Sequence, residues 1–180
     1  DGTVGTWSST TSIPSPRIRL THSVASANGY IYVIGGENSS AQTTVWYAKV
    51  NADGTLGSWV SGTSLPVATS DQAVVIDNGY IYSMGGLAPS ATNTIYYAKI
   101  NYDGSIGAWI GNPNNLASAD SMHSAIAVNG YVYVLGGINN STTVYYAKFN
   151  SDGTIPSFST NAASLPESHQ GSGITYGNGY

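Results

Sequence analysis

The sequence predicts an all-β protein made of repeated four-stranded units. A landmark tripeptide recurs at intervals of 50, 51 and 49 residues, at Asn28-Gly29-Tyr30, Asn78-Gly79-Tyr80, Asn129-Gly130-Tyr131 and Asn178-Gly179-Tyr180. Turn-forming pairs separate short apolar runs within each unit, and no window shows helical periodicity. Repeats of this length specify an architecture before any single residue does.

The middle unit gives the expected order of strands. Residues 72–77 form a short apolar run, and Asn78-Gly79 is a strong hairpin signal. A second strand over residues 80–84 ends at Gly85-Gly86, where the backbone must bend or pack closely. We expect residues 87–93 to form a loop before the third strand.

The second half of the unit supplies the outer strands. Residues 94–100 read as the third strand, residues 101–104 as a turn, and residues 106–111 as the fourth strand. The first two strands are nearly continuous apolar runs, which is expected of a sheet buried on both faces. Four short antiparallel strands per unit are typical of propeller blades, which bury both faces by stacking.

An aromatic residue stands six positions after each Asp of the repeated Asp-Gly pair: Trp7, Trp59, Trp109 and Phe158. We interpret it as a structural residue of the outer strand that fills the gap between neighbouring blades. Stacking on a ligand is the alternative role.

The repeat resembles the kelch repeat. The similarity rests on the stretch from His22 to Gly36, which ends in the paired glycines, on Arg19 three residues before it, and on the later aromatic pair and Trp. It covers essentially the whole chain and implies a kelch-type β-propeller, the architecture also of the galactose oxidase central domain. The departures are Thr69 and Asp120 at the Arg19 position, Gln72 at the His22 position, and Phe158 at the Trp position.

The resemblance places the strands of a blade from the central axis outward and divides the chain. Residues 1–14 become an orphan outer strand, residues 15–66, 67–116 and 117–166 become three full blades, and residues 167–180 begin the next blade with an orphan inner strand. Propellers close with about four to eight blades. We therefore expect the native protein to continue beyond Tyr180, with assembly of several copies as the alternative.

Composition limits the function classes. Only 8% of residues are charged, against about a quarter in ordinary proteins, and 41% are hydrophobic. A surface of hydroxyls and amides suggests a secreted or cell-surface protein. The net charge of -4 argues against a nucleic-acid partner. No apolar stretch approaches the roughly 20 residues that span a bilayer, so we expect no membrane insertion.

No metal site, cofactor or catalytic centre is predicted. The Asp-Gly turns are similar to part of a calcium loop, but Lys49 and its equivalents stand where the first carboxylate should be. Galactose oxidase chemistry needs a copper site with a Cys-modified Tyr in that family, and this chain has no Cys. His22, Gln72 and His123 share one repeat position, where hydrogen bonding to a loop backbone is the expected role. Convergence of histidines as ligands at a channel mouth stays open.

The candidate binding residues are those that differ between the repeat units. In the geometry that the resemblance implies, the loops entering the inner strands share one rim with the loops after Gly-Gly. That rim would carry Arg17, Arg19, Glu37, Asp71, Gln72, Asp120 and His169.

These observations favour a non-catalytic binding or display module of a secreted or cell-surface protein, which presents rim loops to a protein or a glycan. Rigid blades hold loops that vary at little cost to the core. One alternative is part of a carbohydrate-active enzyme with its catalytic residues outside these 180 residues. Another is an architectural repeat that binds further blades or copies of itself.

Overall fold

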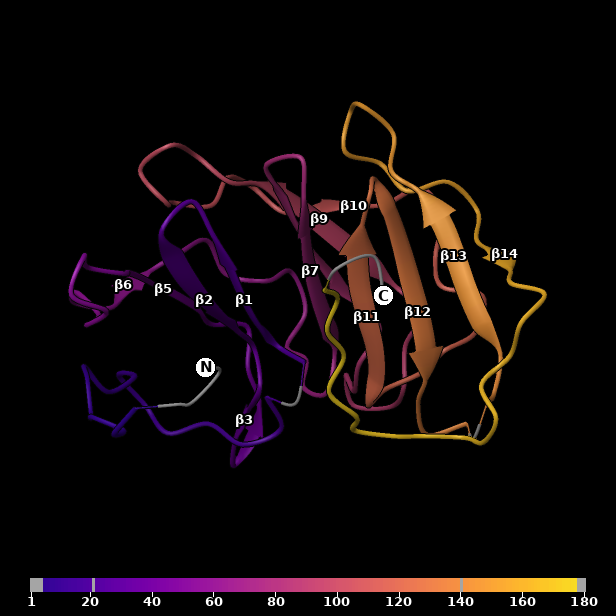
Figure 1. Cartoon of the computed structure of the whole chain (residues 1–180), viewed down its shortest axis with the longest axis horizontal. Coiled ribbons are helices and arrows are strands. Elements are labelled where there is room, and N and C mark those ends of the chain that lie inside the picture. Colours follow the sequence, from indigo (N-terminus) through magenta and orange to yellow (C-terminus); the bar gives the residue numbers. More distant parts are fainter. Residues whose placement is uncertain (1–4, 21, 140, 178–180) are drawn as a thin grey trace.

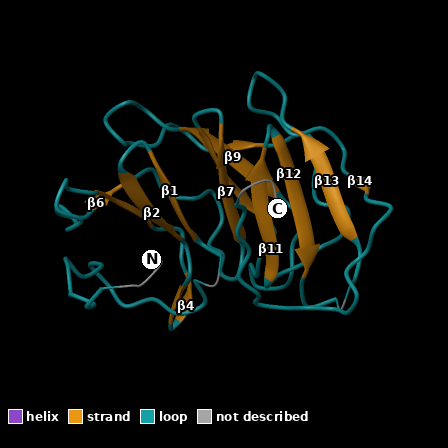
Figure 2. Cartoon of the chain, viewed as in Figure 1, coloured by secondary structure: helices purple, strands orange, loops and turns teal. Residues whose placement is uncertain are grey.

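The computed structural model describes residues 5–20, 22–139 and 141–177. Within these ranges the chain forms strands, turns and loops, and Figure 2 shows no helix. Three four-stranded antiparallel sheets follow one another along the chain, and they are named blades 1, 2 and 3 below. The predicted all-β class and the three four-stranded blades are confirmed. No helix of the described part is long and apolar enough to cross a membrane.

The strands of blade 1 are ordered as they occur in the chain: β1 (Val24–Ala27), β2 (Tyr30–Ile34), β5 (Val45–Lys49) and β6 (Val60–Ser61). The loop after Gly35-Gly36 adds a small hairpin of β3 (Glu37–Asn38) and β4 (Ser40–Ala41). Blade 2 contains β7 (Ala73–Asp77), β8 (Tyr80–Met84), β9 (Ile95–Lys99) and β10 (Ile110–Gly111). Blade 3 contains β11 (His123–Val128), β12 (Tyr131–Gly136), β13 (Val144–Lys148) and β14 (Ser159–Thr160).

The first hairpin of each blade is fixed by its Asn-Gly pair. Asn28, Asn78 and Asn129 have φ of 52°, 47° and 52°, and the glycine after each is also left-handed. Two consecutive residues with positive φ make the turn whose twist matches the flanking strands. The register repeats as a result: Ile31, Ile81 and Val132 lie opposite Ala48, Ala98 and Ala147.

The outer strands are shorter than predicted. The expected strand over residues 106–111 is reduced to Ile110–Gly111, which pairs with Tyr96 and Tyr97. Ile106 forms an isolated bridge with Ile100, and the Gly107 N–H donates to the Lys99 carbonyl at 2.9 Å. The register shifts by one residue between the Ile100–Ile106 bridge and the Tyr97–Ile110 pair, so the ladder is not continuous between the turn and β10.

Neither predicted orphan strand is a strand within its described part. Residues 5–14 and 167–177 are irregular, and residues 1–4 and 178–180 lie outside the described ranges. The N-terminal segment still occupies an outer position beside blade 1, because the Trp59 indole donates to the Thr11 carbonyl at 3.0 Å. The Trp109 indole donates to the Thr63 carbonyl in the same way at 2.9 Å. No described strand pairs with either segment in a ladder.

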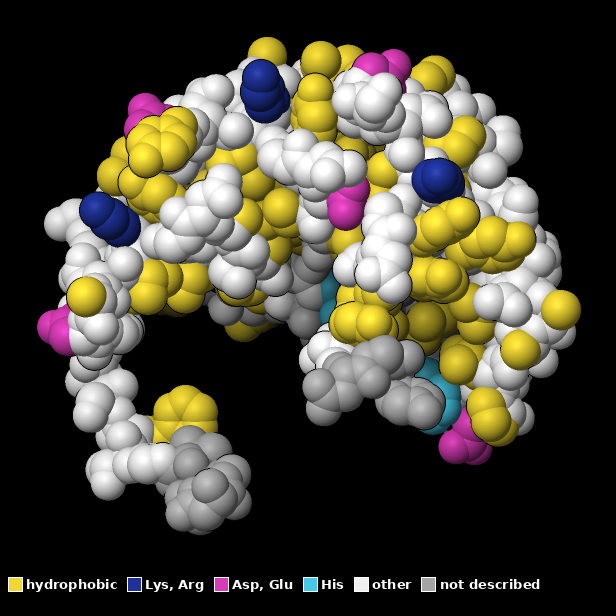
Figure 3. Space-filling view, turned by 45° about the horizontal axis from the view of Figure 1, so that its top comes forward, with side chains coloured by type: hydrophobic (Ala, Val, Ile, Leu, Met, Phe, Trp, Pro, Cys, Tyr) yellow, Lys and Arg dark blue, Asp and Glu magenta, His cyan; other side chains and the backbone are white. Residues whose placement is uncertain are grey.

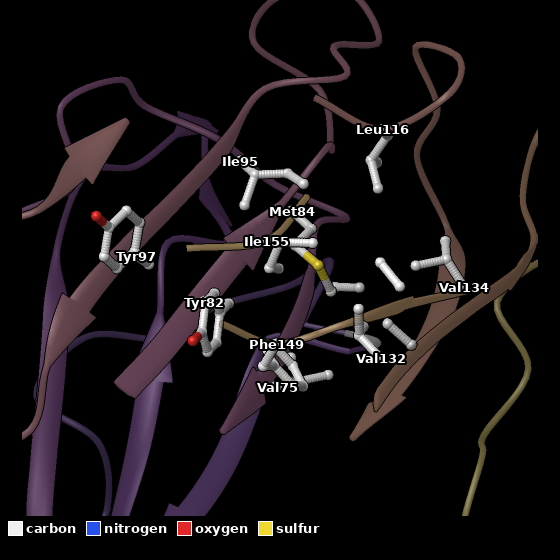
Figure 4. Packing of buried hydrophobic residues seen from close by; sticks show 13 residues of the cluster. Val75, Tyr82, Met84, Ile95, Tyr97, Leu116, Val132, Val134, Phe149 and Ile155 are labelled. Atoms are coloured by element: carbon white, nitrogen blue, oxygen red, sulfur yellow. The ribbon is translucent and has the colours of Figure 1, made fainter. Parts of the chain in front are cut away.

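Neighbouring blades share their hydrophobic cores. One cluster joins Val75, Tyr82, Met84, Ile95 and Tyr97 of blade 2 to Val132, Val134, Phe149 and Ile155 of blade 3, as Figure 4 shows. A second cluster joins blades 1 and 2. The Tyr32 hydroxyl donates to the Gly104 carbonyl at 3.0 Å, and the Tyr82 hydroxyl donates to the Gly153 carbonyl at 2.9 Å. Each blade therefore holds the Asp-Gly turn of the next.

The blades form an arc, with their inner strands β1, β7 and β11 on the inside (Figure 1). Contacts of β7 with both β1 and β11 confirm that the inner strands are neighbours. The space-filling view shows a hollow between the N-terminal arm and the C-terminal end of the arc (Figure 3). The Asn-Gly and Asp-Gly turns lie on one edge of the arc, and the loops after Gly-Gly lie on the opposite edge (Figure 1).

Candidate binding surfaces at the edges of the blades

The edge formed by the loops after Gly-Gly and by the loops entering the inner strands is here called the Gly-Gly rim. The Arg19 side chain connects its own loop to Glu37 and to Asp71. The Arg19 Nε lies 2.9 Å from Glu37 Oε2, and its Nη1 donates to Asp71 Oδ2 at 2.9 Å. The rim thus brings together three of the predicted residues, from the entry loops of blades 1 and 2 and from strand β3.

Arg19 has an unusual backbone conformation as well as two ion pairs. Arg19 has φ of 55°, which is uncommon for a residue other than glycine. Asp71 is buried, and its backbone N–H donates to the Arg19 carbonyl at 3.2 Å. Asp71 and Glu37 both raise the pKa of Arg19, first through the hydrogen bond to Asp71. The guanidinium is therefore a charged and positioned group on an otherwise weakly charged surface.

Ile18 lies between the two arginines and is 63% exposed. Its backbone pairs with Glu37 in both directions, at 3.0 and 2.9 Å. On its other side, the Arg17 guanidinium lies 4.5 Å from the centre of the Trp46 ring and donates to Ser15 Oγ at 2.9 Å. We call residues 17–19 the Arg-Ile-Arg strip. It presents one apolar side chain between two held cations.

Gln72 and Asp120 do not form part of the exposed rim. Gln72 is fully buried, and its Nε2 donates to the Ile34 carbonyl at 2.8 Å. Asp120 is nearly buried and accepts the backbone N–H groups of Ser121 and Ile138 at 2.8 and 3.0 Å. Burial raises the pKa of Asp120, and these hydrogen bonds oppose that effect. Both residues fix loops, so their expected exposure on the rim is corrected.

His169 lies on the same rim at the far end of the arc. Its side chain is partly exposed and stands 3.9 Å from Glu167 Oε1. Its carbonyl accepts the Gly137 N–H at 2.8 Å, as the Thr69 carbonyl accepts the Gly36 N–H. The side chain is free to contact a partner, but it has no contact with the Arg-Ile-Arg strip.

The equivalent positions of His22, Gln72 and His123 confirm the expected structural role only in part. Gln72 binds a loop carbonyl as predicted. His123 is fully buried near the Met84 carbonyl, without a hydrogen bond of normal geometry to any described residue. Burial, and then repulsion from His22, lower the pKa of His123 to about 4. His123 is therefore neutral at physiological pH.

His22 contacts the C-terminal segment. Its Nε2 lies against the Ser172 carbonyl, and Ser124 Oγ lies 3.3 Å from the same nitrogen. The Ser124 hydroxyl itself donates to the Ser172 carbonyl. A serine beside a histidine is the arrangement of a nucleophile and its base, but this hydroxyl is nearly buried and directed at a backbone oxygen. The contact fastens the segment to the inner strands.

The Asp-Gly turns are closed by their own side chains. Asp53 Oδ1 accepts both the Thr55 N–H and the Thr55 hydroxyl, and Asp103 and Asp152 repeat this pattern. These hydrogen bonds lower the pKa of each carboxyl, those of the side chains first. The described residues include no group of three or more His, Cys, Asp or Glu suited to a metal ion.

Sequence reasoning missed Ile18 and the contact of Arg17 with Trp46. The signal was present, because Ile18 stands between two of only five basic residues in the chain. The exposure of Ile18 could not be predicted from the sequence, because an isoleucine before an inner strand is normally part of the core.

The arrangement of the blades defines the class of protein: these are stacked four-stranded blades of a β-propeller. Comparison with protein families supports the same class, because the kelch motif matches residues 18–47. The propeller fold and the match of the kelch motif to residues 18–47 support the kelch-repeat propeller that the sequence predicted.

Comparison with solved structures also supports the fold. The structure titled "Structure of YjhT" aligns with a TM-score of 0.65 and 14% sequence identity. The match covers 87% of this chain and 54% of that one, so this chain spans about half the length of the similar structure. No curated protein sequence matches the chain.

Proposed function

We propose that the chain is a non-catalytic module that binds a protein through the Gly-Gly rim, with the Arg-Ile-Arg strip at the centre of the contact. Kelch-repeat propellers are protein-binding modules in general. The observation that carries the proposal is the exposure of Ile18 between Arg17 and Arg19.

The chemistry of the strip suits a protein partner. Arginine is enriched at interface hot spots, and such residues act best when they are positioned before binding. Glu37 and Asp71 hold Arg19, and Trp46 and Ser15 hold Arg17. The partner surface would carry an apolar residue that covers Ile18 and an acidic group that reaches the exposed edge of a guanidinium.

The non-catalytic part of the proposal has its own support. The neighbouring side chains of His22 and Ser124 both contact the Ser172 carbonyl. Asp71, the most deeply buried rim carboxylate, is engaged by Arg19. A secreted or cell-surface location remains part of the proposal, on the ground of the low content of charged residues.

Glycan binding is a second candidate, and one observation favours it. Tyr102 is completely exposed at an Asp-Gly turn, on the edge opposite the strip. Aromatic rings that are fully exposed on a surface rich in hydroxyls and amides offer a flat face to a sugar. Glycan binding would then use the opposite edge of the blades, so mutations can distinguish it from protein binding at the Arg-Ile-Arg strip.

A peptide-display selection against the folded chain tests the proposal. We expect the selected peptides to combine acidic and aliphatic residues, and to lose at least tenfold in affinity for Ile18→Asp. Lys99→Glu, on the opposite edge, is the matched charge-changing control and should leave affinity unchanged. Peptides that bind Ile18→Asp normally but fail on Lys99→Glu would overturn the proposal. A glycan array with Tyr102→Ala as its control tests the second candidate.

A further inference from the structure

A small polar pocket lies at the Gly-Gly rim, between blade 2 and the segment that enters this blade. We call it the blade 2 pocket, and its volume is about 90 Å³. The entering segment contributes Thr69, and blade 2 contributes Ser83, Thr92, Thr94 and Tyr96. Five of the eight described residues that line the pocket therefore carry a hydroxyl, and none of the eight is charged.

The same place in blade 3 is almost filled, with a space of only about 20 Å³. Val134 of blade 3 holds the position of Ser83, and Asp120 holds the position of Thr69. The Asp120 carboxylate is engaged by two backbone N–H groups. Because serine fills less space than valine, blade 2 has room where blade 3 has little. The repeat therefore departs from its own pattern at two positions that meet in one pocket.

Two hydroxyls of this pocket have no hydrogen-bond partner among the described residues. Thr69 is 6% exposed, and its Oγ1 is buried without a partner. Ser83 is 2% exposed and lines the pocket, and no described group forms a hydrogen bond with its hydroxyl. A buried hydroxyl without a hydrogen bond costs free energy, so such groups normally bind water or a ligand. The two side chains are therefore suited to a polar occupant.

The pocket also contains a positioned pair of hydroxyls. Thr92 Oγ1 and Thr94 Oγ1 are 3.0 Å apart, and the Thr94 N–H donates to Thr92 Oγ1 at 3.2 Å. Because one hydroxyl of the pair donates to the other, one hydroxyl proton remains for an occupant. Backbone hydrogen bonds of 2.9 Å, from Thr92 to Gly86 and from Gly85 to Thr94, hold both residues in place. The occupant must therefore accept a hydrogen bond from this pair.

The lining selects a small uncharged group that both accepts and donates hydrogen bonds. A charged group would be buried among lining residues that carry no counterion, which costs free energy. The volume is that of about three water molecules, so the pocket takes a group of a few atoms rather than a whole drug-sized ligand. A carboxamide has this size, and it accepts at its oxygen and donates at its nitrogen.

We propose that the blade 2 pocket binds the carboxamide of an Asn or Gln side chain of the protein that covers the Gly-Gly rim. The pocket adjoins the Arg-Ile-Arg strip. The Thr69 carbonyl accepts the Gly36 N–H at 3.0 Å, and Asp71, which pairs with Arg19, follows two residues after Thr69. Two extended residues span about 7 Å, so one segment of the partner can reach both places. This inference rests on the function proposed for the rim and assigns a second anchor to the same partner.

A titration followed by nuclear magnetic resonance tests the pocket itself, with acetamide as the probe and acetate as its charged counterpart. For the folded 180-residue chain we expect saturable shifts at Thr69, Ser83 and Thr94 with acetamide, and shifts about fivefold smaller with acetate at the same concentration. Ser83→Val, which copies Val134 of blade 3, should abolish the acetamide shifts.

A second variant covers the case in which Ser83→Val unfolds the chain, as circular dichroism would show. Thr94→Val removes one hydroxyl of the pair and should weaken acetamide binding about fivefold. Thr143→Val changes the equivalent residue of blade 3, which lies outside the pocket, and is the matched control that should leave binding unchanged.

Peptides selected for binding to the folded chain test where the carboxamide comes from. Replacement of the Asn or Gln of such a peptide by Ala should weaken its binding to the unchanged chain about fivefold. The same replacement should have no effect on binding to Ser83→Val. Ile18→Asp should weaken peptide binding but leave the acetamide shifts intact, so failure of the strip and failure of the pocket are distinguishable.

Three results would overturn the proposal. Absence of saturable acetamide shifts, or equal shifts in Ser83→Val, would show that the pocket holds water only. Acetamide binding without any effect of the carboxamide in the peptides would exclude a protein side chain as the occupant. Tighter binding of N-acetylglucosamine than of acetamide, abolished by Ser83→Val, would assign the pocket to a glycan instead.

Discussion

At the scale of the residue, one repeat position carries two different buried polar side chains. Gln72 satisfies a loop carbonyl with its amide, and His123 takes the same place in the next blade with a neutral ring. A buried group that must charge in the unfolded chain links stability to pH. The pKa of His123 is lowered from 6.5 to about 4 by burial and by His22.

His123 should make the stability of the fold sensitive to mild acid. Between about pH 6.5 and pH 4 the unfolded chain binds a proton at His123 and the folded chain does not, so the free energy of unfolding falls as the pH falls. We expect a loss of about 2 kcal/mol between pH 7 and pH 5. Urea unfolding at the two pH values measures it. His123→Gln, which copies Gln72, should remove most of this difference, and an unchanged pH dependence in that variant would contradict the assignment.

Arg19 should stabilise the fold through its buried partner. Arg19→Ala leaves the Asp71 carboxylate buried without its cation, and breaking a buried pair in this way costs about 3–5 kcal/mol. Because the Arg19 guanidinium is exposed, the loss in the free energy of unfolding should be smaller than for a fully buried pair but still measurable. Asp71→Asn in the same background should recover part of the loss. Failure of the second change to recover any stability would show that the ion pair is not the cause.

At the scale of the element, the second strand of each blade holds the Asp-Gly turn of the next. The Tyr82 hydroxyl reaches the Gly153 carbonyl, whereas the Tyr133 hydroxyl makes no hydrogen bond to a described residue. Burial raises the pKa of the Tyr82 phenol well above its usual range, so the hydroxyl remains a donor at any moderate pH.

The two tyrosines provide a matched pair of deletions. Tyr82→Phe leaves a buried carbonyl without its partner and should cost about 1–3 kcal/mol. Tyr133→Phe removes a hydroxyl from a partly buried face of blade 3 and should change the free energy of unfolding by less than about 0.5 kcal/mol. Chemical denaturation of the two variants measures the difference. Equal effects would contradict a stabilising role for the hydrogen bond between Tyr82 and Gly153.

The elements themselves were largely predictable from the sequence. Asn-Gly pairs and apolar runs placed the first two strands of each blade correctly, because local turn chemistry and two-sided burial act on neighbouring residues. The fourth strand was predicted too long, because its pairing shifts register by one residue between the Ile100–Ile106 bridge and the Tyr97–Ile110 pair. The rim was less predictable from the sequence. The burial of Gln72 and Asp120 and the exposure of Ile18 depend on contacts between blades, which no local sequence pattern indicates.

At the scale of the whole molecule, the stack of blades explains the stability of the chain. Each blade covers its neighbour with residues at the same repeat positions, and among the described residues the matching face of blade 3 is only partly buried. The function proposed for the Gly-Gly rim depends on residues that differ between repeats.

The central claim is that the blades stack through their Asp-Gly turns, and three glycines at one repeat position test it most directly. All three have φ near 80°, at Gly54 (82°), Gly104 (81°) and Gly153 (85°). A Cβ at Gly104 or Gly153 would lie 2.6 or 2.8 Å from the ring of Tyr30 or Tyr80, whereas at Gly54 it would meet no described atom within 4 Å.

The measurement is the free energy of unfolding of the three Gly→Ala variants. Each should lose about 1–2 kcal/mol from the left-handed backbone. Gly104→Ala and Gly153→Ala should lose about 1–3 kcal/mol more, because the tyrosine ring must move. Equal losses at all three positions would contradict the stacked arrangement.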